Sequence, residues 1–459
     1  MLRHLALHLN AGASVDQTTN DGSTPLIVAS GKGYSEAVHL LLAARASVDQ
    51  ATNNGSTALY MASDHGYSEI VHLLIAAQAS VDQSKNNGCT PLLTASHKGN
   101  SEVVQLLLAA QASVDQATSK GFTPLYAASN RDHSEVVQLL LAAQASVDRA
   151  ANDNSTALFT ASCQGHFKVV QLLLAAKANV NQAHDNGSTP LFMASQAGHL
   201  AAVQLLVLAG ASADQANRTG VTPLLVASRE GNLEVVQLLL REGGSRVEER
   251  DNLGMSSLMN AARNRHFEVM RYLVEDGGSS VIERADNGWT ALLFAADESK
   301  GRHHDRRFSV VRWLLDIGGS NMDEQGNDGS TIWTLLPPWF DENDNDLEEA
   351  AAACLRTCLT RSAPPQMHSG ELPFSSEELF SPTQQELVRK AETLRTRLPH
   401  WLKLRRLELA GGLPSLLPLL SIIEEYCYPS EGEMWDEELG VPLGDIYETY
   451  VGMLLQKVP

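Results

Sequence analysis

Short apolar runs at helical spacing alternate with polar turns along the first three quarters of the chain. In residues 87–119, Thr90-Pro91 precede an apolar segment that predicts a helix ending near His97, because proline suits the first turn of a helix. A second segment begins at Ser101, an expected N-cap. Its apolar residues share one helix face: Val104, Leu107 and Leu108. The pattern therefore predicts a helix-turn-helix with a polar hairpin.

The same pattern returns every 33 residues. Gly22-Ser-Thr-Pro-Leu26 is followed by Gly55-Ser-Thr-Ala-Leu59 and by Gly88-Cys-Thr-Pro-Leu92, and the last spacings lengthen to 34 and then 41 residues. Nine full units start at residues 21, 54, 87, 120, 153, 186, 219, 253 and 287. A unit of this size cannot bury its apolar face alone, so neighbours must stack into a continuous core. The predicted fold is an all-α repeat solenoid.

The repeated phrase identifies a family resemblance. The T-P-L run, the following A-S or A-A, the turn glycine and the V-V-x-L-L-L run resemble the ankyrin repeat over residues 1 to about 336. The resemblance implies stacked helix-turn-helix units with β-hairpin turns. It also implies a non-enzymatic scaffold or adaptor that recognises a protein partner through its concave face and hairpin turns, without a cofactor.

Two positions depart from the family pattern. Apolar or aromatic residues replace the usual histidine after T-P-L, so packing is expected to replace a hydrogen bond between units: Ile27, Tyr60, Leu93, Tyr126, Phe159, Phe192, Leu225, Met259 and Leu293. Longer side chains replace the usual glycine after the second helix: Arg45, Gln78, Gln111, Gln144 and Lys177. If the backbone there is left-handed, each replacement costs about 1 kcal/mol relative to glycine.

The repeat array is predicted to span residues 1–336. Leu5, Leu7 and Leu9 align with the end of a second helix, so the first unit is a half unit. This indicates a fragment or a frayed end, and it favours a truncated gene model or a missing upstream segment. A partial tenth unit begins at Gly329 and stops at Pro337-Pro338, because proline removes a backbone donor.

The remaining segments lie around the end of the array. The basic insertion 300–307 is either a finger for an acidic partner or a tolerated surface loop. Residues 337–360 predict an acidic loop and a helix that caps the last repeat, residues 361–376 a linker, and residues 377–459 a helical C-terminal segment. The basic residues of that last segment are expected on a solvated helix face.

Charge and cysteine content narrow the class of function. The formal net charge is -20, which opposes sequence-independent binding to nucleic acid or anionic lipid. The five cysteines form no C-x-x-C pair, and Cys354 and Cys358 have no further ligand nearby for a metal site. No apolar run is long enough for a signal peptide or a membrane span. The sequence predicts an intracellular, cytoplasmic protein, with the nucleus left open.

No catalytic motif is visible. The chain lacks G-x-x-x-x-G-K-[ST], H-E-x-x-H and G-x-S-x-G, and its repeated glycines fall at turns. His65, His97 and His166 recur at positions specific to single units and are expected to be surface or turn residues. We therefore expect no catalytic residues, no cofactor and no metal. A third alternative, a regulatory fragment of a larger enzyme, would require an upstream catalytic domain.

Comparison of the units with one another predicts a partner-binding patch. Small residues follow the turn position in most early units. The units that start at residues 219, 253 and 287 instead carry apolar, aromatic and arginine side chains, which are typical of interface cores. The predicted contact residues are Arg218, Val221, Arg229, Leu253, Met255, Arg263 and Trp289. The alternative is that units near a cap diverge because they pack against it.

A C-terminal motif suggests a second function. The stretch from Leu417-Pro418 to Tyr426 resembles the end of a SOCS box, and the stretch around Leu404 resembles the helix of that module that docks elongin. Arg405 replaces the cysteine expected before Arg406, and the spacing between the two parts is short. The resemblance implies a substrate receptor of a cullin-type ubiquitin ligase, with elongin as a partner. The alternative is a helical hairpin that packs on the repeats.

These two alternatives make different predictions for Leu404→Asp and Leu417→Asp. In a SOCS-like segment, each substitution abolishes elongin capture by the purified chain and leaves the thermal unfolding of the array unchanged. In a hairpin packed on the repeats, each substitution lowers the unfolding temperature instead. Failure of the unsubstituted chain to capture elongin would contradict the ligase hypothesis.

Overall fold

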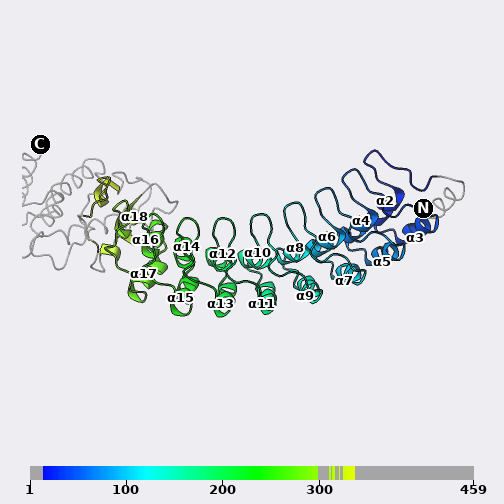
Figure 1. Cartoon of the computed structure of the whole chain (residues 1–459). Coiled ribbons are helices and arrows are strands. Elements are labelled where there is room, and N and C mark those ends of the chain that lie inside the picture. The colour runs from blue at the N-terminus through cyan, green and yellow to red at the C-terminus, as the bar shows by residue number, and fades with distance from the viewer. Residues whose placement is uncertain (1–13, 298–309, 312, 316–319, 321–323, 336–459) are drawn as a thin grey trace, which may run out of the picture. The chain divides into compact units, whose positions relative to one another are not determined.

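The chain forms two compact units, Met1–Asn252 and Leu253–Pro459. The computed structural model describes residues 14–297, 310–311, 313–315, 320 and 324–335, which are coloured in Figure 1. The half unit before residue 14, the basic insertion, and all segments beyond residue 335 lie outside the described residues. The predictions made for them therefore stay predictions.

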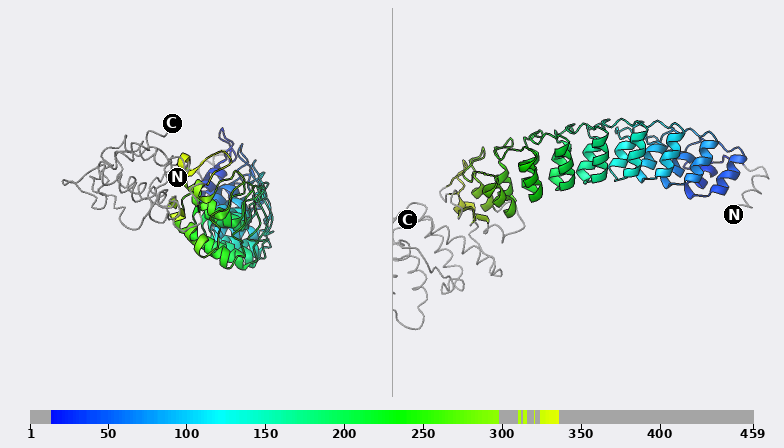
Figure 2. Two further views of the ribbon diagram at one scale, coloured as in Figure 1. Left: turned by 90° about the vertical axis from the view of Figure 1, so that its left-hand side faces the viewer. Right: turned by 90° about the horizontal axis from the view of Figure 1, so that it is seen from below.

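The first unit consists of two rows of helices, as predicted. The first helices of the repeats form the row beside the hairpin loops, and the second helices form the other row (Figure 1). The first row contains α2 (Pro25–Lys32), α4 (Ala58–His65), α6 (Pro91–Lys98), α8 (Pro124–Ser129), α10 (Ala157–Gln164), α12 (Pro190–Ala197) and α14 (Pro223–Glu230). The second row contains α3 (Ser35–Ala43), α5 (Ser68–Ala76), α7 (Ser101–Ala109), α9 (Ser134–Ala142), α11 (Phe167–Ala175), α13 (Leu200–Leu208) and α15 (Leu233–Arg241). Helices of successive repeats lie side by side (Figure 2).

Each first helix begins at the threonine of the repeated phrase. Thr90 has an extended backbone, and its hydroxyl accepts a hydrogen bond of 3.1 Å from the Leu93 amide. Pro91 follows in the first turn, where its missing N–H has no partner to lose. The threonine cap recurs from Thr24 to Thr222, and the proline recurs except at Ala58 and Ala157. The predicted start of the first helix is thus confirmed.

The start of the second helix corrects one prediction. Ser101 is the first residue of α7 and not its N-cap, which is Asn100. No side chain caps this helix, because the Asn100 amide group instead donates to the Ser63 carbonyl of the preceding repeat at 2.9 Å. The Asn100 side chain therefore links neighbouring repeats and does not accept a hydrogen bond from the free backbone N–H groups of α7.

The core runs continuously through the stacked helices. Within one repeat, Leu125 of α8 and Val137 and Leu140 of α9 are at most 1% exposed. Their equivalents in the other repeats of the first unit are equally buried, such as Leu92 and Leu158. Each side of such a repeat meets a neighbour, so the apolar face of one repeat is completed by the next.

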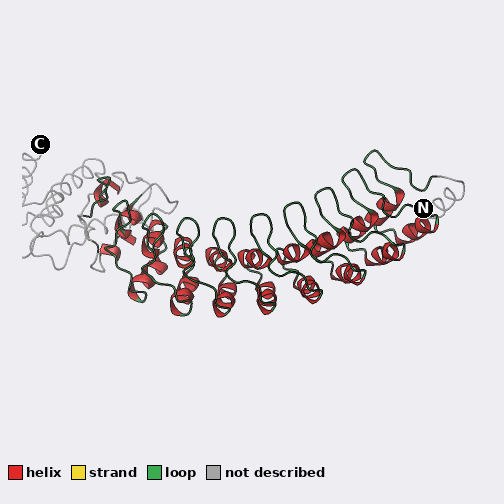
Figure 3. Cartoon of the chain, in the orientation of Figure 1, coloured by secondary structure: helices red, strands yellow, loops and turns green. Residues whose placement is uncertain are grey.

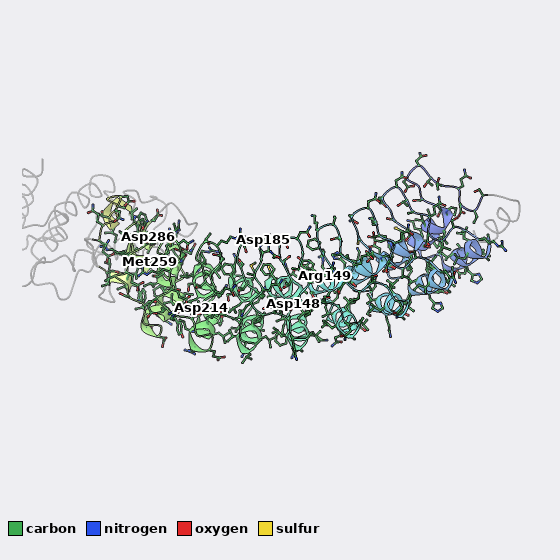
Figure 4. All side chains as sticks on the ribbon, in the orientation of Figure 1. Asp148, Arg149, Asp185, Asp214, Met259 and Asp286 are labelled. Carbon is green, nitrogen blue, oxygen red and sulfur yellow. The ribbon has the colours of Figure 1, made fainter. Side chains whose placement is uncertain are left out.

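Polar contacts join neighbouring repeats along three lines. At the start of the second helices, His133 Nε2 lies 3.0 Å from the His97 carbonyl oxygen, in the position that Asn100 occupies one repeat earlier. After the second helices, Asp115 accepts a 3.0 Å hydrogen bond from the amide of Ser146. Equivalent aspartate contacts occur from Asp16 to Asp148, which Figure 4 labels with its neighbour Arg149.

The third line runs through the hairpins. The Asn152 amide donates to the Lys120 carbonyl of the preceding hairpin at 3.0 Å, and Asp185 donates to Asp153 at the same distance. Gly121 has a φ of 84°, and a Cβ there would lie 2.8 Å from the Asn152 nitrogen, so only glycine fits without a shift. In the described residues these hairpins are drawn as loops, with no strand ribbon (Figure 3).

The second unit repeats the same elements. It contains α16 (Ser257–Arg263), α17 (Phe267–Glu275), α18 (Ala291–Ala296) and α20 (Ile332–Leu335). Ser256 and Thr290 cap α16 and α18, and α16 packs against both α17 and α18. The Asp286 amide donates to the Leu253 carbonyl at 3.0 Å, so hairpins are also joined in this unit.

The second helices of five repeats end in a left-handed residue other than glycine, as the sequence suggested. Gln111 has a φ of 63°, and its amide donates to Leu108 while that of Ala112 donates to Leu107, both at 3.0 Å. This is the Schellman arrangement, in which glycine is usual because a Cβ is disfavoured. The same conformation occurs at Arg45, Gln78, Gln144 and Lys177.

We expect Gln111→Gly to raise the free energy of unfolding by about 1 kcal/mol, because it removes the Cβ from a left-handed backbone. Urea titration of the full chain measures the change. Gly210 provides a matched reverse variant, since it occupies the same position with a φ of 82° and open space around it. Gly210→Gln should destabilise by a similar amount. Equal or lower stability of Gln111→Gly would show that the left-handed residue carries no such cost.

Candidate protein-interaction surface

The hairpin loops and first helices carry the positions that vary most between repeats. One such position follows the turn glycine and holds serine at Ser23, Ser56 and Ser188. These hydroxyls serve the hairpin itself in some repeats, as Ser56 Oγ donates to Asn54 at 2.7 Å. Larger side chains stand at the same position in other repeats, among them Phe122, Val221 and Trp289. Repeats therefore differ in the side chain that follows the turn.

Three residues of the predicted patch belong to the first unit. Arg218 is exposed at a hairpin, where its amide donates to the Asn186 carbonyl at 2.9 Å. The Arg229 guanidinium lies 3.1 Å from the Glu230 carboxylate at the end of α14. Val221 is only 9% exposed. The other four residues belong to the second unit, so the predicted patch is divided between the two units.

Val221 and Met255 were predicted as contact residues, but both are buried. Val221 turns inward and packs in a cluster with Phe192 of the preceding repeat and with Leu225 and Val226. Met255 is 3% exposed. An apolar side chain beside the hairpin gains more from contact with its neighbours than from water, and the bulky first-helix residues here offer that contact. Because they are buried, these two side chains pack beneath the surface and are not exposed on it.

Arg263 and Trp289 of the second unit meet on a residue that the sequence comparison missed. The Phe294 ring is 6% exposed, and the Trp289 ring centroid lies 5.2 Å from it. The Arg263 guanidinium carbon lies 5.9 Å from the same ring centroid, and its Nη1 lies 3.8 Å from the Met255 sulfur. We call Met255, Arg263, Trp289 and Phe294 the Phe294 cluster. The predicted residues Met255, Arg263 and Trp289 therefore lie together, and Phe294 joins Arg263 and Trp289.

Polar contacts hold Trp289 of the Phe294 cluster in place, and its side chain and that of Arg263 stay partly exposed. The Trp289 Nε1–H donates to both Asp328 carboxylate oxygens, at 3.2 and 3.3 Å. Hydrogen bonds from the backbone and hydroxyl of Ser330, together with that from Trp289, lower the pKa of Asp328, so it stays ionised at neutral pH. Arg263 and Trp289 are half-buried, and Leu253 on the adjacent hairpin is 64% exposed.

Phe294 could have been found from the sequence. It directly follows the position of the family histidine, where Met61, Thr94 and Ala127 occupy earlier repeats. A phenylalanine among such residues is a visible outlier. In the same unit, Figure 4 labels Met259, which is 1% exposed, and Asp286, which is exposed on a hairpin.

A second set of side chains lies in the first unit and was also missed. At the family histidine position, Tyr126 and Phe159 remain half-buried, whereas Ile27, Leu93 and Leu225 are buried. Tyr126 stacks on Phe122 with ring centroids 4.6 Å apart. Phe159 stacks on His184 of the next repeat at 5.2 Å. Packing between repeats thus replaces the family hydrogen bond at Phe159, as predicted.

Tyr60 shows how such a ring is covered within the chain. Lys85 Nζ of the next repeat lies 5.0 Å from the Tyr60 ring centroid, and the Tyr60 hydroxyl lies 3.9 Å from Cys89 Sγ. Burial raises the pKa of the Tyr60 hydroxyl to about 12 and also raises the pKa of the Cys89 thiol. Both groups are therefore neutral at pH 7, and Cys89 lacks the thiolate character of a reactive cysteine.

The histidines singled out in the sequence have structural contacts. His65 is exposed, and its Nδ1 lies 2.9 Å from the Met61 carbonyl. His166 Nε2 lies 3.3 Å from the Asn130 carbonyl of the preceding repeat. Burial lowers the pKa of His97, which favours its neutral form. Within the described ranges, no group of three or more His, Cys, Asp or Glu side chains could hold a metal ion.

Two further predictions concern residues outside those that the structure describes. The residues expected to dock an adaptor are Leu404, Leu417, Pro418 and Tyr426, and all of them lie in the segment beyond residue 335. Cys354 and Cys358 lie there as well. Among the helices that are described, none combines the length and hydropathy of a membrane span.

Comparison with known proteins agrees with the repeat architecture. The family model described as "Ankyrin repeats (3 copies)" matches residues 2–87, 77–151, 158–251 and 224–328. The chain is similar to the crystal structure of the human ASB11 ankyrin repeat domain, at 27% identity and a TM-score of 0.45, over 49% of this chain and 99% of that one. No curated protein matches the chain. Because the family model matches most of the sequence, the chain belongs to the ankyrin repeat family.

Proposed function

We propose that this chain is a non-enzymatic scaffold or adaptor that binds a protein partner through the concave face and hairpin turns of its ankyrin array. Ankyrin repeats are protein-interaction scaffolds, and the proposal assigns the main contact to the Phe294 cluster and Leu253. The observation that supports it best is the half-exposed pair of Trp289 and Arg263 over a buried phenylalanine. Tryptophan and arginine dominate the binding energy of protein interfaces.

The geometry of the Phe294 cluster favours binding without a large entropic cost. Trp289 is fixed by its contacts with Phe294 and Asp328, so little of its conformational freedom remains to be lost on association. The Arg263 guanidinium lies near the Phe294 ring and presents a planar set of donors, which suits carboxylate or backbone carbonyl groups of a protein. The cluster thus combines an aromatic anchor with a hydrogen-bonding group.

The charge of the chain supports a protein partner over nucleic acid. The formal net charge is -20, and phosphate backbones are bound mainly by clustered lysine and arginine. We place the protein in a reducing intracellular compartment, the cytoplasm, because Cys89 and Cys163 are free thiols. The SOCS-like stretch at Leu417 supports the alternative of a ubiquitin-ligase substrate receptor, which the elongin experiment above tests.

We expect Trp289→Ala and Arg263→Ala each to weaken partner binding by about 2 kcal/mol, roughly thirtyfold in Kd. The partner is first identified by proximity labelling with the full chain and is then purified for calorimetric titration. Loss of each side chain removes contact area or donors at the centre of the interface. Because Trp289 and Arg263 are only half-buried, the unfolding temperature should change little.

Arg271→Ala serves as the matched control. Arg271 is an exposed arginine of the same unit, but it lies on the second helix α17, 3.0 Å from Glu268. Its removal should leave the Kd unchanged. Early unfolding of the Trp289 and Arg263 variants together with normal binding would identify the Phe294 cluster as a packing surface and contradict the proposal.

A further inference from the structure

The first unit shows a repeated way of covering aromatic rings. In two repeats, the ring at the family histidine position is covered by a side chain from the next hairpin, three residues before its turn glycine. Lys85 lies over Tyr60, and His184 stacks on Phe159. Both covering groups are nitrogen bases, and a cation is attracted to the face of an aromatic ring.

Tyr126 is the exception to this arrangement. The equivalent residue of the next hairpin is Ala151, whose methyl group cannot reach over a ring as Lys85 does. Tyr126 instead stacks on Phe122 of its own repeat, and both rings remain half-buried. Among the residues that the structure describes, no cation lies over either ring. The rings therefore lack the covering group that their neighbours have.

Exposed carboxylates lie on the hairpins that follow these rings in the chain. Asp153 lies two residues after Ala151 on the same hairpin, and its side chain is 50% exposed. Its carboxylate is 3.6 Å from Nε2 of His184, the residue that stacks on Phe159. Asp185 on the following hairpin is also exposed, and Figure 4 labels it there. Residues 14–252 carry 21 acidic against 14 basic side chains, a net negative charge.

We propose that Phe122 and Tyr126, with Asp153 on the next hairpin, form a docking site for a lysine or arginine side chain in a basic segment of a partner protein. In this proposal, a cation of the partner covers the Tyr126 ring in the way that Lys85 covers the Tyr60 ring within the chain. Aromatic faces provide the attraction to the cation, and the carboxylate adds charge complementarity. This site lies in the first unit and is independent of the Phe294 cluster.

Peptide titration of the full chain tests the proposal. The probe is a fluorescein-labelled peptide of alternating glycine and lysine at low ionic strength, compared with the same peptide bearing acetylated lysines, which are neutral. We expect the lysine peptide to bind and the acetylated peptide not to bind. Tyr126→Leu keeps an apolar side chain but removes the aromatic face, and it should weaken binding about fivefold.

Two further variants separate this site from general attraction to an acidic surface. Tyr60→Leu is the matched control, because Lys85 already covers that ring, and it should bind the lysine peptide like the unsubstituted chain. Ala151→Lys places a lysine at the position equivalent to Lys85 and should block binding. Thermal unfolding of each variant shows whether the array is intact.

Three results would overturn the proposal: equal binding of the acetylated peptide, unchanged binding by Tyr126→Leu, or an equal loss in Tyr60→Leu. The last of these would mean that the peptide adsorbs to the acidic surface without using the uncovered rings. If Ala151→Lys is folded and binds the lysine peptide normally, the docking position is also wrong.

Discussion

The structure depends on one constraint, which is that a 33-residue pair of short helices cannot enclose a core. Leu125, Val137 and Leu140 are fully buried only because the repeats on both sides cover them. The polar contacts follow the same rule, since Asn100, Asp115 and Asn152 each bond to a neighbouring repeat. Most of what holds a repeat in place therefore comes from the repeats beside it.

This constraint separates structural positions from variable ones. Residues that face a neighbouring repeat are restricted in size and polarity, as the glycine at Gly121 and the threonine caps show. Residues on hairpins and first helices face water as well, so they can change without breaking the stack. Both candidate surfaces occupy these freer positions. The Phe294 cluster fills them with an aromatic and arginine group, and the Phe122–Tyr126 pair leaves two rings without a covering cation.

Much of the fold could be predicted from the sequence because the signals are local and repeated. The threonine and proline at each first helix, the helical spacing of the apolar residues and the left-handed residue at Gln111 depend on the backbone of one repeat. The N-cap at Asn100 was not predictable, because the Asn100 side chain bonds to another repeat instead of to its own helix. A serine near a helix start carries no information about that competing contact.

The candidate site was less predictable because exposure depends on the neighbours of a side chain. Val221 and Met255 occupy the position that presents Trp289 to solvent, yet both turn inward. Phe192 of the preceding repeat offers Val221 an apolar partner, whereas Trp289 carries an N–H that Asp328 accepts. The residue type at one position does not specify whether its side chain turns inward or toward solvent. The partner residue, often a full repeat away, decides this.

Hydrogen–deuterium exchange of the full chain with Leu140→Ala tests the dependence on neighbours most directly. The substitution leaves a cavity in the fully buried core of one repeat, at a cost of about 2–5 kcal/mol. If stacking holds each repeat in place, amide protection will fall in α8 and α9 and also in the flanking helices α6, α7, α10 and α11. Loss of protection confined to α8 and α9 would contradict the account, because it would mean that each repeat is stable on its own.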